Sequence, residues 1–315
     1  AKSVAITPGN MNTPLGISRF VSKLTGEEDI LIFELGEYYP KDIEKLCRLV
    51  KPQMGIITGI NEAHLSKFKT LDRTIGTIFE LADALPEDMV YKNGDSPLVR
   101  TRTSPDDPLI YTEDGVNGWV VSDIATGLEG TTFTAKRGHI TVHAKSGLLG
   151  RHQVGPLVAC IDIADRLGLT PHQIEQGMAT TGPFEHRLQP RPLAGAWVVD
   201  DTYNGNSDGI RAGLNWLAEV PAKRRVYVTP GLVEQGSKSQ MIHEAIGRHI
   251  AESADVVVLM KNSVTPYIAA GLKEAGFKGE LKIVADPVQF YSNLEQFVAA
   301  GDVVLLQNDW TDNFH

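Results

Sequence analysis

The sequence predicts an α/β protein in which a parallel-sheet domain carries appended antiparallel hairpins and is followed by a second α/β domain. Short apolar runs of the β type alternate with helical patterns through residues 1–95 and again from residue 197 onward, which is typical of parallel sheets. Between residues 109 and 145, apolar and polar residues alternate singly between glycine-bearing turns, which indicates antiparallel hairpins. The length of 315 residues also favours two domains, since one domain takes roughly 150.

The composition is that of an ordinary globular protein, with 42% hydrophobic and 22% charged residues. Lys and Arg total 30 against 39 Asp and Glu, a net charge of -9, and no basic run stands out, so no nucleic-acid partner is expected. No apolar run approaches the ~18 residues of a membrane span. Cys47 and Cys160 stand far apart, so neither a disulfide framework nor a zinc–thiolate site is expected. A reducing, cytoplasmic location and a monomeric state fit best.

The first domain begins with alternating strands and helices. Strands are predicted at residues 3–6, 29–34 and 55–60, and helices at 14–24, 40–50 and 71–85. The run from Asp29 to Glu34 is apolar almost throughout, which predicts a strand buried on both faces. This strand–helix–strand order requires a parallel sheet.

Antiparallel hairpins and one further helix complete the first domain. Residues 119–124 and 140–143 are predicted as strands, and residues 157–167 as a helix. The pattern then breaks at Thr180–Pro183, where Gly182 and Pro183 stand among few apolar residues. The predicted domains are therefore residues 1–182 and 183–315, joined by a hinge at Thr181–Pro183.

The second domain reads as a Rossmann-like, doubly wound sheet. Its five predicted strands are residues 197–200, 225–228, 255–260, 281–284 and 302–306, and helices are predicted at 208–217, 240–253, 265–275 and 288–299. In such sheets, ligands bind beyond the carboxyl ends of the strands. Polar residues after these strands are therefore candidates for a binding site.

Polar side chains follow three consecutive strands of the first domain. They lie in Thr7–Asn12, Glu34–Glu37 and Asn61–Leu65. Glu34 and His64 could share a divalent cation such as Mg²⁺, since a carboxylate oxygen suits that ion and a neutral imidazole can complete its coordination. Strand-end polar residues are also common cap and turn formers, so loop capping stays an alternative.

Two further candidates lie in the second domain. Arg187 has a planar guanidinium suited to bidentate binding of phosphate or carboxylate, and Asp200–Asp208 is acidic and amide-rich, as in a site or a helix cap. Gly231–Ser239 falls between a strand and a helix, as a phosphate loop would, but the inserted Ser237 displaces the lysine from the GxxxxGK[ST] spacing. We interpret this segment as a near miss, that is, a loop that resembles the phosphate-loop motif without matching its spacing.

Seven short motifs occur in order along the chain. They are Thr7–Asn12 with Gly16, Phe33–Gly36, Thr58–Leu65, Gly150–His152, Glu185–Leu188, Asp200–Asn206 and Gly231–Gly236. Together they resemble the Mur ligase family, the ATP-dependent amide-forming ligases of peptidoglycan precursor synthesis. Within it they are most similar to the branch that adds D-alanyl-D-alanine to a UDP-muramoyl tripeptide (MurF type). The motifs cover the central and C-terminal domains of that family.

The resemblance implies acyl-phosphate chemistry with ATP and Mg²⁺, a UDP-muramoyl peptide and an amino acid or dipeptide. It implies that Glu34 and His64 bind the metal, and that substrate is bound by Thr7, Asn10 and Asn12. It assigns ATP binding to His152, Arg187, Asp201, Tyr203 and Asn204, with Arg187, Asp201 and His64 also catalytic. Closure of the two domains would assemble the site.

The sequence also departs from the family pattern. The family's phosphate loop precedes the segment that matches Thr7, so the chain is expected to be a fragment without that loop and without the uridine-binding domain. Ile75 stands where the family carries a carbamylated lysine, Gln153 follows His152 where the family has asparagine, and Gln307 stands in the basic motif after the last strand. The alternatives are a non-catalytic binding or regulatory relative, and a ligase acting on folate or another polymer.

Overall fold

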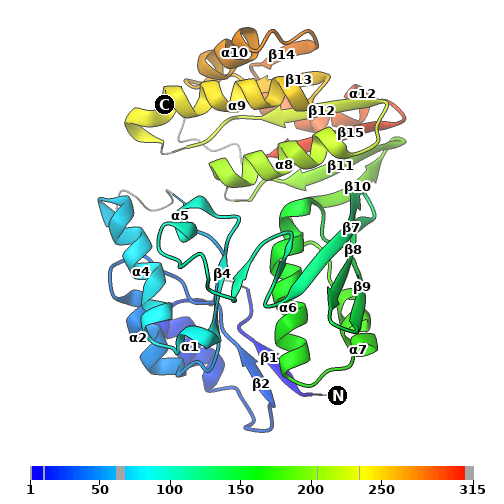
Figure 1. Cartoon of the computed structure of the whole chain (residues 1–315). Coiled ribbons are helices and arrows are strands. Elements are labelled where there is room, and N and C mark those ends of the chain that lie inside the picture. The colour runs from blue at the N-terminus through cyan, green and yellow to red at the C-terminus, as the bar shows by residue number, and fades with distance from the viewer. Residues whose placement is uncertain (1, 10, 62–67, 204, 234, 309–315) are drawn as a thin grey trace. The chain divides into compact units, whose positions relative to one another are not determined.

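A computed structural model describes residues 2–9, 11–61, 68–203, 205–233 and 235–308, and it confirms the predicted α/β class (Figure 1). The chain divides into two compact units. Unit 1 comprises Ala1–Thr112 with Val116–Gly118, and unit 2 comprises Glu113–Gly115 with Trp119–His315. No helix in the described ranges is long and apolar enough to cross a membrane.

In the described residues, the parallel strands of unit 1 form two separate sheets. The three strands predicted in this region are confirmed, each shorter than its apolar run. One sheet pairs β1 (Val4–Ile6) with β2 (Ile30–Ile32), and the other has the order β3 (Gly55–Ile57), β4 (Val90–Asn93), β5 (Ile110–Tyr111). β4 was not predicted, because its Lys92 interrupts the apolar pattern. That side chain is nevertheless buried, paired with Asp107 at 2.6 Å.

The prediction that residues 29–34 form a strand buried on both faces is wrong. Leu31 and Ile32 are 42% and 48% exposed. In the part of the chain that the structure describes, β2 pairs only with β1. An apolar run has the same appearance in a central strand and in a strand with one neighbour, so the sequence pattern could not distinguish the two cases.

Two helices of unit 1, α1 (Pro14–Val21) and α4 (Leu71–Asp83), begin at side-chain caps that hold their first turns. Thr13 accepts a hydrogen bond from the Gly16 N–H, and Thr70 accepts one from Arg73 N–H. Leu81 packs against both apolar clusters of the unit and so ties the helices together. The helical segments are α1 (Pro14–Val21), α2 (Asp42–Val50), α4 (Leu71–Asp83), η1 (Glu87–Met89) and α5 (Pro97–Arg100).

The predicted hairpins are confirmed as antiparallel pairs in a sheet of their own. β7 pairs with β8 and β8 with β9, and the order is β6 (Gly115–Val116), β7 (Trp119–Gly127), β8 (Gly130–Arg137), β9 (Ile140–Ser146). Helical segments follow at η2 (Arg151–Gln153), α6 (Val154–Arg166) and α7 (Pro171–Met178). Asp162 on α6 accepts hydrogen bonds from Trp119 at 3.1 Å and Arg137 at 2.7 Å, so this helix is fixed to the sheet by polar contacts.

The remaining strands build one six-stranded sheet, and all five predicted strands are present. The order is β10 (Gln189–Leu193), β11 (Ala196–Asp201), β15 (Asp302–Gln307), β12 (Arg224–Thr229), β13 (Val256–Met260), β14 (Glu280–Val284). Only β10 is antiparallel to its neighbour. It was missed because Pro190 and Pro192 look like a break, yet prolines are tolerated in an edge strand.

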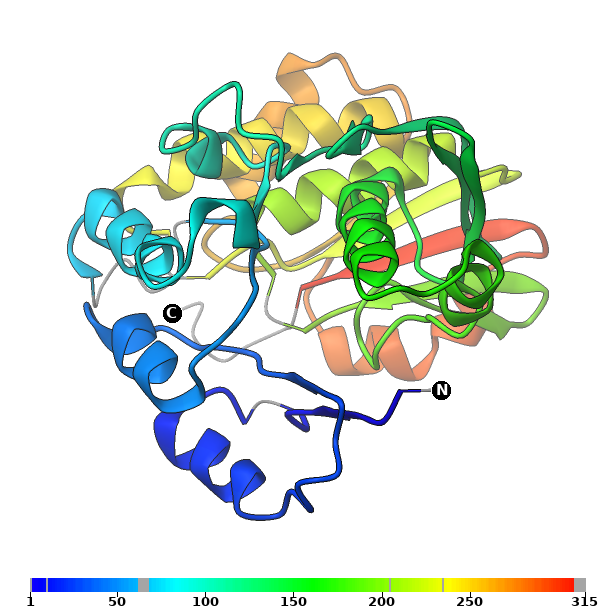
Figure 2. The same ribbon diagram turned by 60° about the horizontal axis from the view of Figure 1, so that its bottom comes forward.

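Helices cover both faces of this sheet, as expected for a doubly wound fold. Val199, Tyr227 and Leu305 belong to one core cluster, and their neighbours in sequence belong to the other. The first cluster includes α8 (Ser207–Glu219), α9 (Ser239–Ser253) and α10 (Thr265–Glu274), and the second includes α11 (Pro287–Ser292) and α12 (Leu294–Phe297). Figure 2 shows α11 and α12 on the opposite side of the sheet from α9.

The predicted helix at 288–299 is split in the structure. Asn293 separates α11 from α12, with φ -110° and ψ 16°, and its Nδ2 donates to the Gln289 carbonyl oxygen at 2.8 Å. Asparagine competes with helix continuation by bonding to nearby backbone. The two short helices nevertheless pack their aromatic side chains on the sheet as one surface.

The predicted domain boundary at Gly182 lies inside unit 2. On its N-terminal side, Leu149 and Leu128 pack with the cluster formed by α8, α9 and α10. The Gly147 N–H donates to the Thr181 carbonyl oxygen at 2.9 Å, and Thr181 and Ser146 hydroxyls lie 2.7 Å apart. The division at residues 182 and 183 and its hinge stay predictions.

Candidate functional site

The site residues predicted from the sequence fall into one group in each unit. Thr7, Asn12 and Glu34 belong to unit 1, while the second group belongs to unit 2 and contains His152, Arg187, Asp201 and Tyr203. Asn10, His64 and Asn204 lie outside the described residues. The predicted sharing of a cation by Glu34 and His64 is therefore untested.

In unit 1, the ends of β1 and β2 bring three predicted residues together. Thr7 N–H continues the sheet by donating to the Ile32 carbonyl oxygen at 3.0 Å. The Thr7 hydroxyl accepts from the Glu34 N–H at 3.0 Å, and Asn12 Nδ2 donates to Glu34 Oε1 at 3.1 Å. Thr7 and Asn12 thus orient the Glu34 backbone and carboxylate, whatever ligand that carboxylate meets.

Gly36 provides the space that Asn12 needs. A Cβ at Gly36 would lie 2.7 Å from Asn12 Cγ and 2.9 Å from both of its terminal atoms. The Gly36 N–H also donates to the Asn12 carbonyl oxygen at 3.0 Å. The glycine is therefore required by close approach of the Asn12 amide, which explains its place directly after Glu34 and Leu35.

The donor atoms of this group suit Mg²⁺ in kind. Carboxylate, amide and hydroxyl oxygens are the ligands that this cation prefers. Burial raises the pKa of the Glu37 carboxyl, and the nearby charges of Asp42 and Glu34 raise it further. Within the described ranges, no three His, Cys, Asp or Glu side chains gather as a metal site. Glu34 is thus a fitting ligand with one carboxylate, Glu37, near it in the described residues.

Ile75 lies on α4 and contributes packing. It is 6% exposed and belongs to the cluster that contains Ile57, Phe79 and Val90. An alkyl side chain in this cluster offers no ligand atom to a metal.

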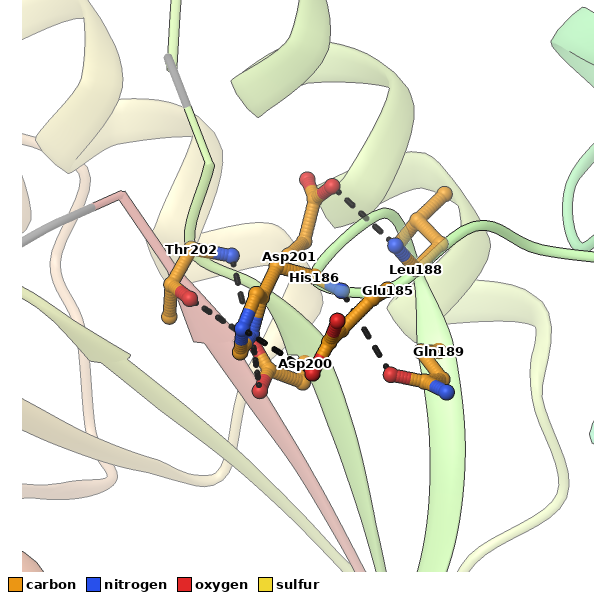
Figure 3. Close-up of polar contacts among 7 residues, drawn as sticks. All are labelled: Glu185, His186, Leu188, Gln189, Asp200, Asp201 and Thr202. Carbon is orange, nitrogen blue, oxygen red and sulfur yellow. Dashed lines mark hydrogen bonds and ion pairs between the residues drawn. The ribbon is translucent and has the colours of Figure 1, made fainter. Parts of the chain in front are cut away.

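In unit 2, the loop before β10 meets the segment that follows β11 (Figure 3). Arg187 Nη1 donates to the Tyr203 carbonyl oxygen at 2.6 Å, and the guanidinium carbon lies 4.7 Å from the centroid of the Tyr203 ring. Tyr203 N–H in turn donates to the His186 carbonyl oxygen at 3.3 Å. Arg187 is exposed and Tyr203 is 45% exposed, so the stacked pair faces solvent.

His186 is held against Asp200. Its Nδ1 lies 2.9 Å from Asp200 Oδ2, and Glu185 lies near its other nitrogen at 3.7 Å (Figure 3). Asp200 Oδ1 accepts from both the N–H and the hydroxyl of Thr202, at 3.2 and 2.7 Å. Asp200 therefore shapes the turn after β11 and anchors the loop that carries Arg187.

Asp201 is partly buried, and each of its carboxylate oxygens accepts a hydrogen bond. Its Oδ1 accepts from the Leu188 N–H at 3.1 Å, and its Oδ2 accepts from Gln307 Nε2 at 2.8 Å. Burial raises the pKa of the Asp201 carboxyl, against the hydrogen bonds from Gln307 and Leu188 and the charge of Arg187, which lower it. The structure thus brings together Arg187, Asp201 and Tyr203.

His152 is the fourth predicted residue of this unit, and it lies in η2. Its ring packs so closely that a Cβ at Gly150, where φ is 97°, would lie 2.7 Å from it. Although part of the residue remains exposed, desolvation lowers the pKa of His152 to about 4. The Gln153 amide lies 2.9 Å from His152 Nε2. A neutral ring at physiological pH is the state that can contact an uncharged base.

The near-miss phosphate loop uses several of its backbone donors internally. Gly231 N–H donates to the Thr229 hydroxyl at 3.0 Å, and Leu232 N–H donates to His243 Nε2 at 3.0 Å. His243 Nδ1 lies 2.6 Å from the Ser239 carbonyl oxygen, so the neutral ring bridges loop and helix. These amides are not available to a phosphate.

Sequence reasoning missed His243 and the role of Gln307. A histidine four residues into the helix after a glycine-bearing loop is a weak signal, since helical histidines are common. Gln307 was noted only as a departure from a basic motif. Its contacts with Asp201, Gly209 and Tyr227 come from three elements far apart in sequence, so no local pattern could reveal them.

The Mur ligase middle domain matches residues 1–164 of the chain, and the Mur ligase glutamate ligase domain matches residues 186–307. The UDP-N-acetylmuramoyl-tripeptide--D-alanyl-D-alanine ligase of Mycobacterium leprae is 28% identical over an alignment 342 positions long, which covers 96% of this chain and 65% of that protein. The Escherichia coli protein of that name is 27% identical over 251 residues, 76% of this chain and 54% of that protein. The chain thus spans less than two thirds of these relatives.

Solved structures share the fold. MurF from Acinetobacter baumannii superposes with a TM-score of 0.78 at 22% identity, covering 98% of this chain and 67% of that chain. MurF ligase from Thermotoga maritima, solved in complex with ADP, gives a TM-score of 0.78 at 23% identity, covering 98% and 70%. Folylpolyglutamate synthase from Thermotoga maritima gives 0.59 at 16% identity, covering 92% and 66%.

Proposed function

Since the chain belongs to the Mur ligase family, we propose that it supplies the middle and C-terminal domains of an ATP-dependent ligase. This ligase joins D-alanyl-D-alanine, or another amino acid or dipeptide, to a UDP-muramoyl peptide through an acyl-phosphate in peptidoglycan precursor synthesis. The names of the Mycobacterium leprae and Escherichia coli relatives support this substrate class. We place the protein in the cytoplasm as a monomer.

The observation that carries the proposal is the grouping of Arg187, Tyr203 and Asp201 at the end of β11. A carboxylate that attacks ATP and the phosphoryl group it attacks are both anionic, so the reaction needs fixed positive charge. Arg187 supplies it on a guanidinium that Tyr203 holds in place by one hydrogen bond and by stacking. The exposed Tyr203 ring also offers a flat surface to a nucleotide base.

The Glu34 group would hold Mg²⁺, which would neutralise phosphoryl charge during transfer. In this proposal Glu34 is the ligand, and Asn12 and Thr7 orient it. His64 is the second proposed ligand. The Asn12 carbonyl oxygen is committed to the Gly36 N–H, so the amide side chain is the part of Asn12 that can meet substrate.

We further propose that the complete ligase has a preceding segment that carries the phosphate loop. Two observations support it: the chain spans 65% of the Mycobacterium leprae relative, and the parallel strands described in unit 1 fall into two sheets. β2 and β3 follow one another in sequence but pair with different strands. A parallel strand between them would join the two sheets into one.

The test compares two proteins. The 315-residue chain alone is expected to release no phosphate above a blank without enzyme when supplied with Mg-ATP, UDP-muramoyl tripeptide and D-alanyl-D-alanine, because the lysine and backbone donors of a phosphate loop are absent. The chain preceded by the corresponding segment of the Mycobacterium leprae relative is expected to form the amide, detected by mass spectrometry. Amide formation by the chain alone contradicts the fragment proposal.

Arginine variants sharpen this test in the extended protein. Arg187→Lys is expected to lower kcat/KM at least ~10-fold, because lysine keeps the charge but loses the planar stacking and the fixed donor. The matched control is Arg191→Lys, an exposed arginine on β10 in the same sheet. Equal activity of the two variants would show that Arg187 has no role in the reaction.

A second function has one observation in its favour. Ile75 packs in an apolar cluster where the family carries a carbamylated lysine, as expected of a non-catalytic binding or regulatory relative. Calorimetry distinguishes the two readings: a ligand-binding relative, once extended, binds UDP-muramoyl tripeptide without consuming ATP. Phosphate release that depends on the peptide rejects this alternative.

A further inference from the structure

A buried hydrogen-bond network ends on the carboxylate of Asp201, and Gln307 stands at its centre. Gln307 lies at the end of β15 and is 1% exposed. Its Nε2 donates to Asp201 Oδ2 at 2.8 Å and to the Gly209 carbonyl oxygen at 2.9 Å. Its Oε1 accepts from the Tyr227 hydroxyl at 2.8 Å. One amide thus connects β15 with β11, α8 and β12.

A glycine on α8 makes this position of the amide possible. A Cβ on Gly213 would lie 2.5 Å from Gln307 Nε2, closer than any side chain could approach. The helix can therefore pass directly over the amide, and its Gly209 carbonyl oxygen can take the second proton of Nε2. The side chain of Gln307 has all of its polar atoms occupied without water.

Tyr227 determines which end of the amide faces Asp201. If the Gln307 amide turned by 180°, its oxygen would face the Asp201 carboxylate and the Gly209 carbonyl, which are both acceptors. The NH₂ group would then meet the Tyr227 oxygen, and the phenol proton would have to turn from Gln307 to the Thr229 hydroxyl, the other side-chain partner of Tyr227. Tyr227 is 0% exposed, so water does not replace that bond. The observed orientation satisfies every one of these groups.

We infer that Gln307 is a positioning residue that orients the Asp201 carboxylate and keeps it ionised, and that Tyr227 fixes the Gln307 amide for this task. Leu188 N–H holds the other carboxylate oxygen at 3.1 Å, so each oxygen has one fixed donor. The inference depends on the proposed function only in taking Asp201 as a residue that faces the nucleotide. The orientation itself is a property of unit 2.

The charges around Asp201 oppose one another. Arg187 favours the ionised carboxylate, whereas burial and the neighbouring Asp200 favour the protonated one. Tyr227 faces the same carboxylate through Gln307, and burial raises the pKa of its phenol, so the phenol stays a neutral donor. In this setting, a neutral amide donor stabilises the anion by hydrogen bonding.

The test is the pKa of Asp201, measured in the full chain by ¹³C-carboxyl NMR across a pH titration. Tyr227→Phe is expected to raise it by about half a pH unit, because the Gln307 oxygen loses its donor and the amide is held less firmly on Oδ2. Gln307→Met is expected to raise it by about one unit, because it removes the donor to Oδ2. Tyr227→Phe removes one oxygen and keeps the ring, so it preserves packing. An unchanged Asp201 pKa in Tyr227→Phe overturns the inference even if Gln307→Met fails to fold.

A double-mutant cycle tests whether Tyr227 acts through Gln307. In the Gln307→Met background, Tyr227→Phe is expected to cause no further shift, because the amide that it orients is gone. Additive shifts would mean that Tyr227 acts on Asp201 directly, and they contradict the inference. The matched control is Tyr267→Phe on α10, which leaves the Asp201 pKa unchanged.

A second readout separates this inference from the proposed function. In the extended ligase, Tyr227→Phe is expected to move the acidic limb of the pH profile of kcat/KM for ATP to higher pH, by the same amount as the Asp201 pKa. A merely structural role of Gln307 would lower thermal stability and leave that limb in place. If the NMR shift occurs and the profile does not move, Gln307 still orients Asp201, and the proposed contact of Asp201 with ATP is wrong.

Discussion

His243 is a buried neutral histidine whose two ring nitrogens bridge Leu232 and Ser239. Burial lowers the pKa of His243, although the contact of its Nδ1 with the Ser239 carbonyl oxygen acts in the opposite direction. Below pH ~6.5 the unfolded chain therefore binds a proton that the native ring resists. The contribution of His243 to the free energy of unfolding decreases as the pH is lowered through that range, and it does not change with pH above it.

We expect His243→Gln to make urea unfolding less dependent on pH between 5 and 6.5. The glutamine amide can still accept from the Leu232 N–H but does not titrate. The control is His172→Gln, an exposed histidine on α7. The same pH slope in wild type and His243→Gln contradicts this prediction.

Gly36 is a second residue whose role follows from one close contact. In Gly36→Ala, the new Cβ meets the Asn12 side chain, which can rotate away because it is short and partly exposed. We expect a loss of stability below about 1 kcal/mol, together with a break of the Asn12–Glu34 hydrogen bond. The Asn12 side-chain amide signals in NMR report this break. Gly59→Ala, where a Cβ meets nothing within 4 Å, leaves those signals unchanged.

At the scale of an element, Ile75 decides how α4 packs on its sheet. We expect Ile75→Lys to destabilise unit 1 by about 2–4 kcal/mol in chemical unfolding, because it removes apolar burial and places an amine among Ile57, Phe79 and Val90. Ile75→Leu keeps the volume and is expected to cost under about 1.5 kcal/mol. Equal stability of the two variants would show that the amine reaches solvent or a carboxylate, and that position 75 can accept the family's lysine.

The sequence predicted correctly those elements in which the apolar residues are the ones that the folded protein buries. Four of the five strands from Trp197 to Leu306 supply buried residues to the two core clusters, whereas β14 is largely exposed. The runs of all five were recognised with nearly their true bounds. β10 and β4 were missed because prolines and a buried ion pair interrupt the pattern. β2 was recognised as a strand, but its exposure depends on which strands pair with it.

The candidate site divides in the same way. Hydrogen bonds join Thr7 and Asn12 to Glu34, and Arg187 to Tyr203, while Asp201 meets the Arg187 loop through the Leu188 N–H. The functional roles that the family resemblance implies for these residues stay predictions. The partners of Asp201 were beyond prediction. They depend on the register of β11 against β15, in which Asp201 lies opposite Gln307, and a register is a property of the folded sheet.

At the scale of the whole molecule, the predicted hinge at Thr181–Pro183 is open to test by small-angle scattering. A Cβ at Gly182 would meet nothing within 4 Å, whereas Thr181 beside it is hydrogen-bonded to Gly147, so motion at this hinge must carry or break that contact. A ligand closes two domains only if it contacts both. We expect the extended ligase to become more compact when Mg-ATP and UDP-muramoyl tripeptide are added. A particle that is already compact without ligand, and unchanged by it, contradicts the hinge.

The small sheet of β1 and β2 has a consequence for how ligands are bound. It contains two strands of three residues with exposed apolar side chains, whereas β11 and β15 lie inside a six-stranded sheet and supply buried residues to both core clusters. Amide protons of the small sheet will exchange with solvent through local opening long before those of the large one. If Glu34 binds the metal as proposed, some of the binding free energy is therefore spent on ordering the small sheet. In the same proposal Arg187 and Asp201 lie beside the large sheet, so less of their binding free energy is lost to ordering.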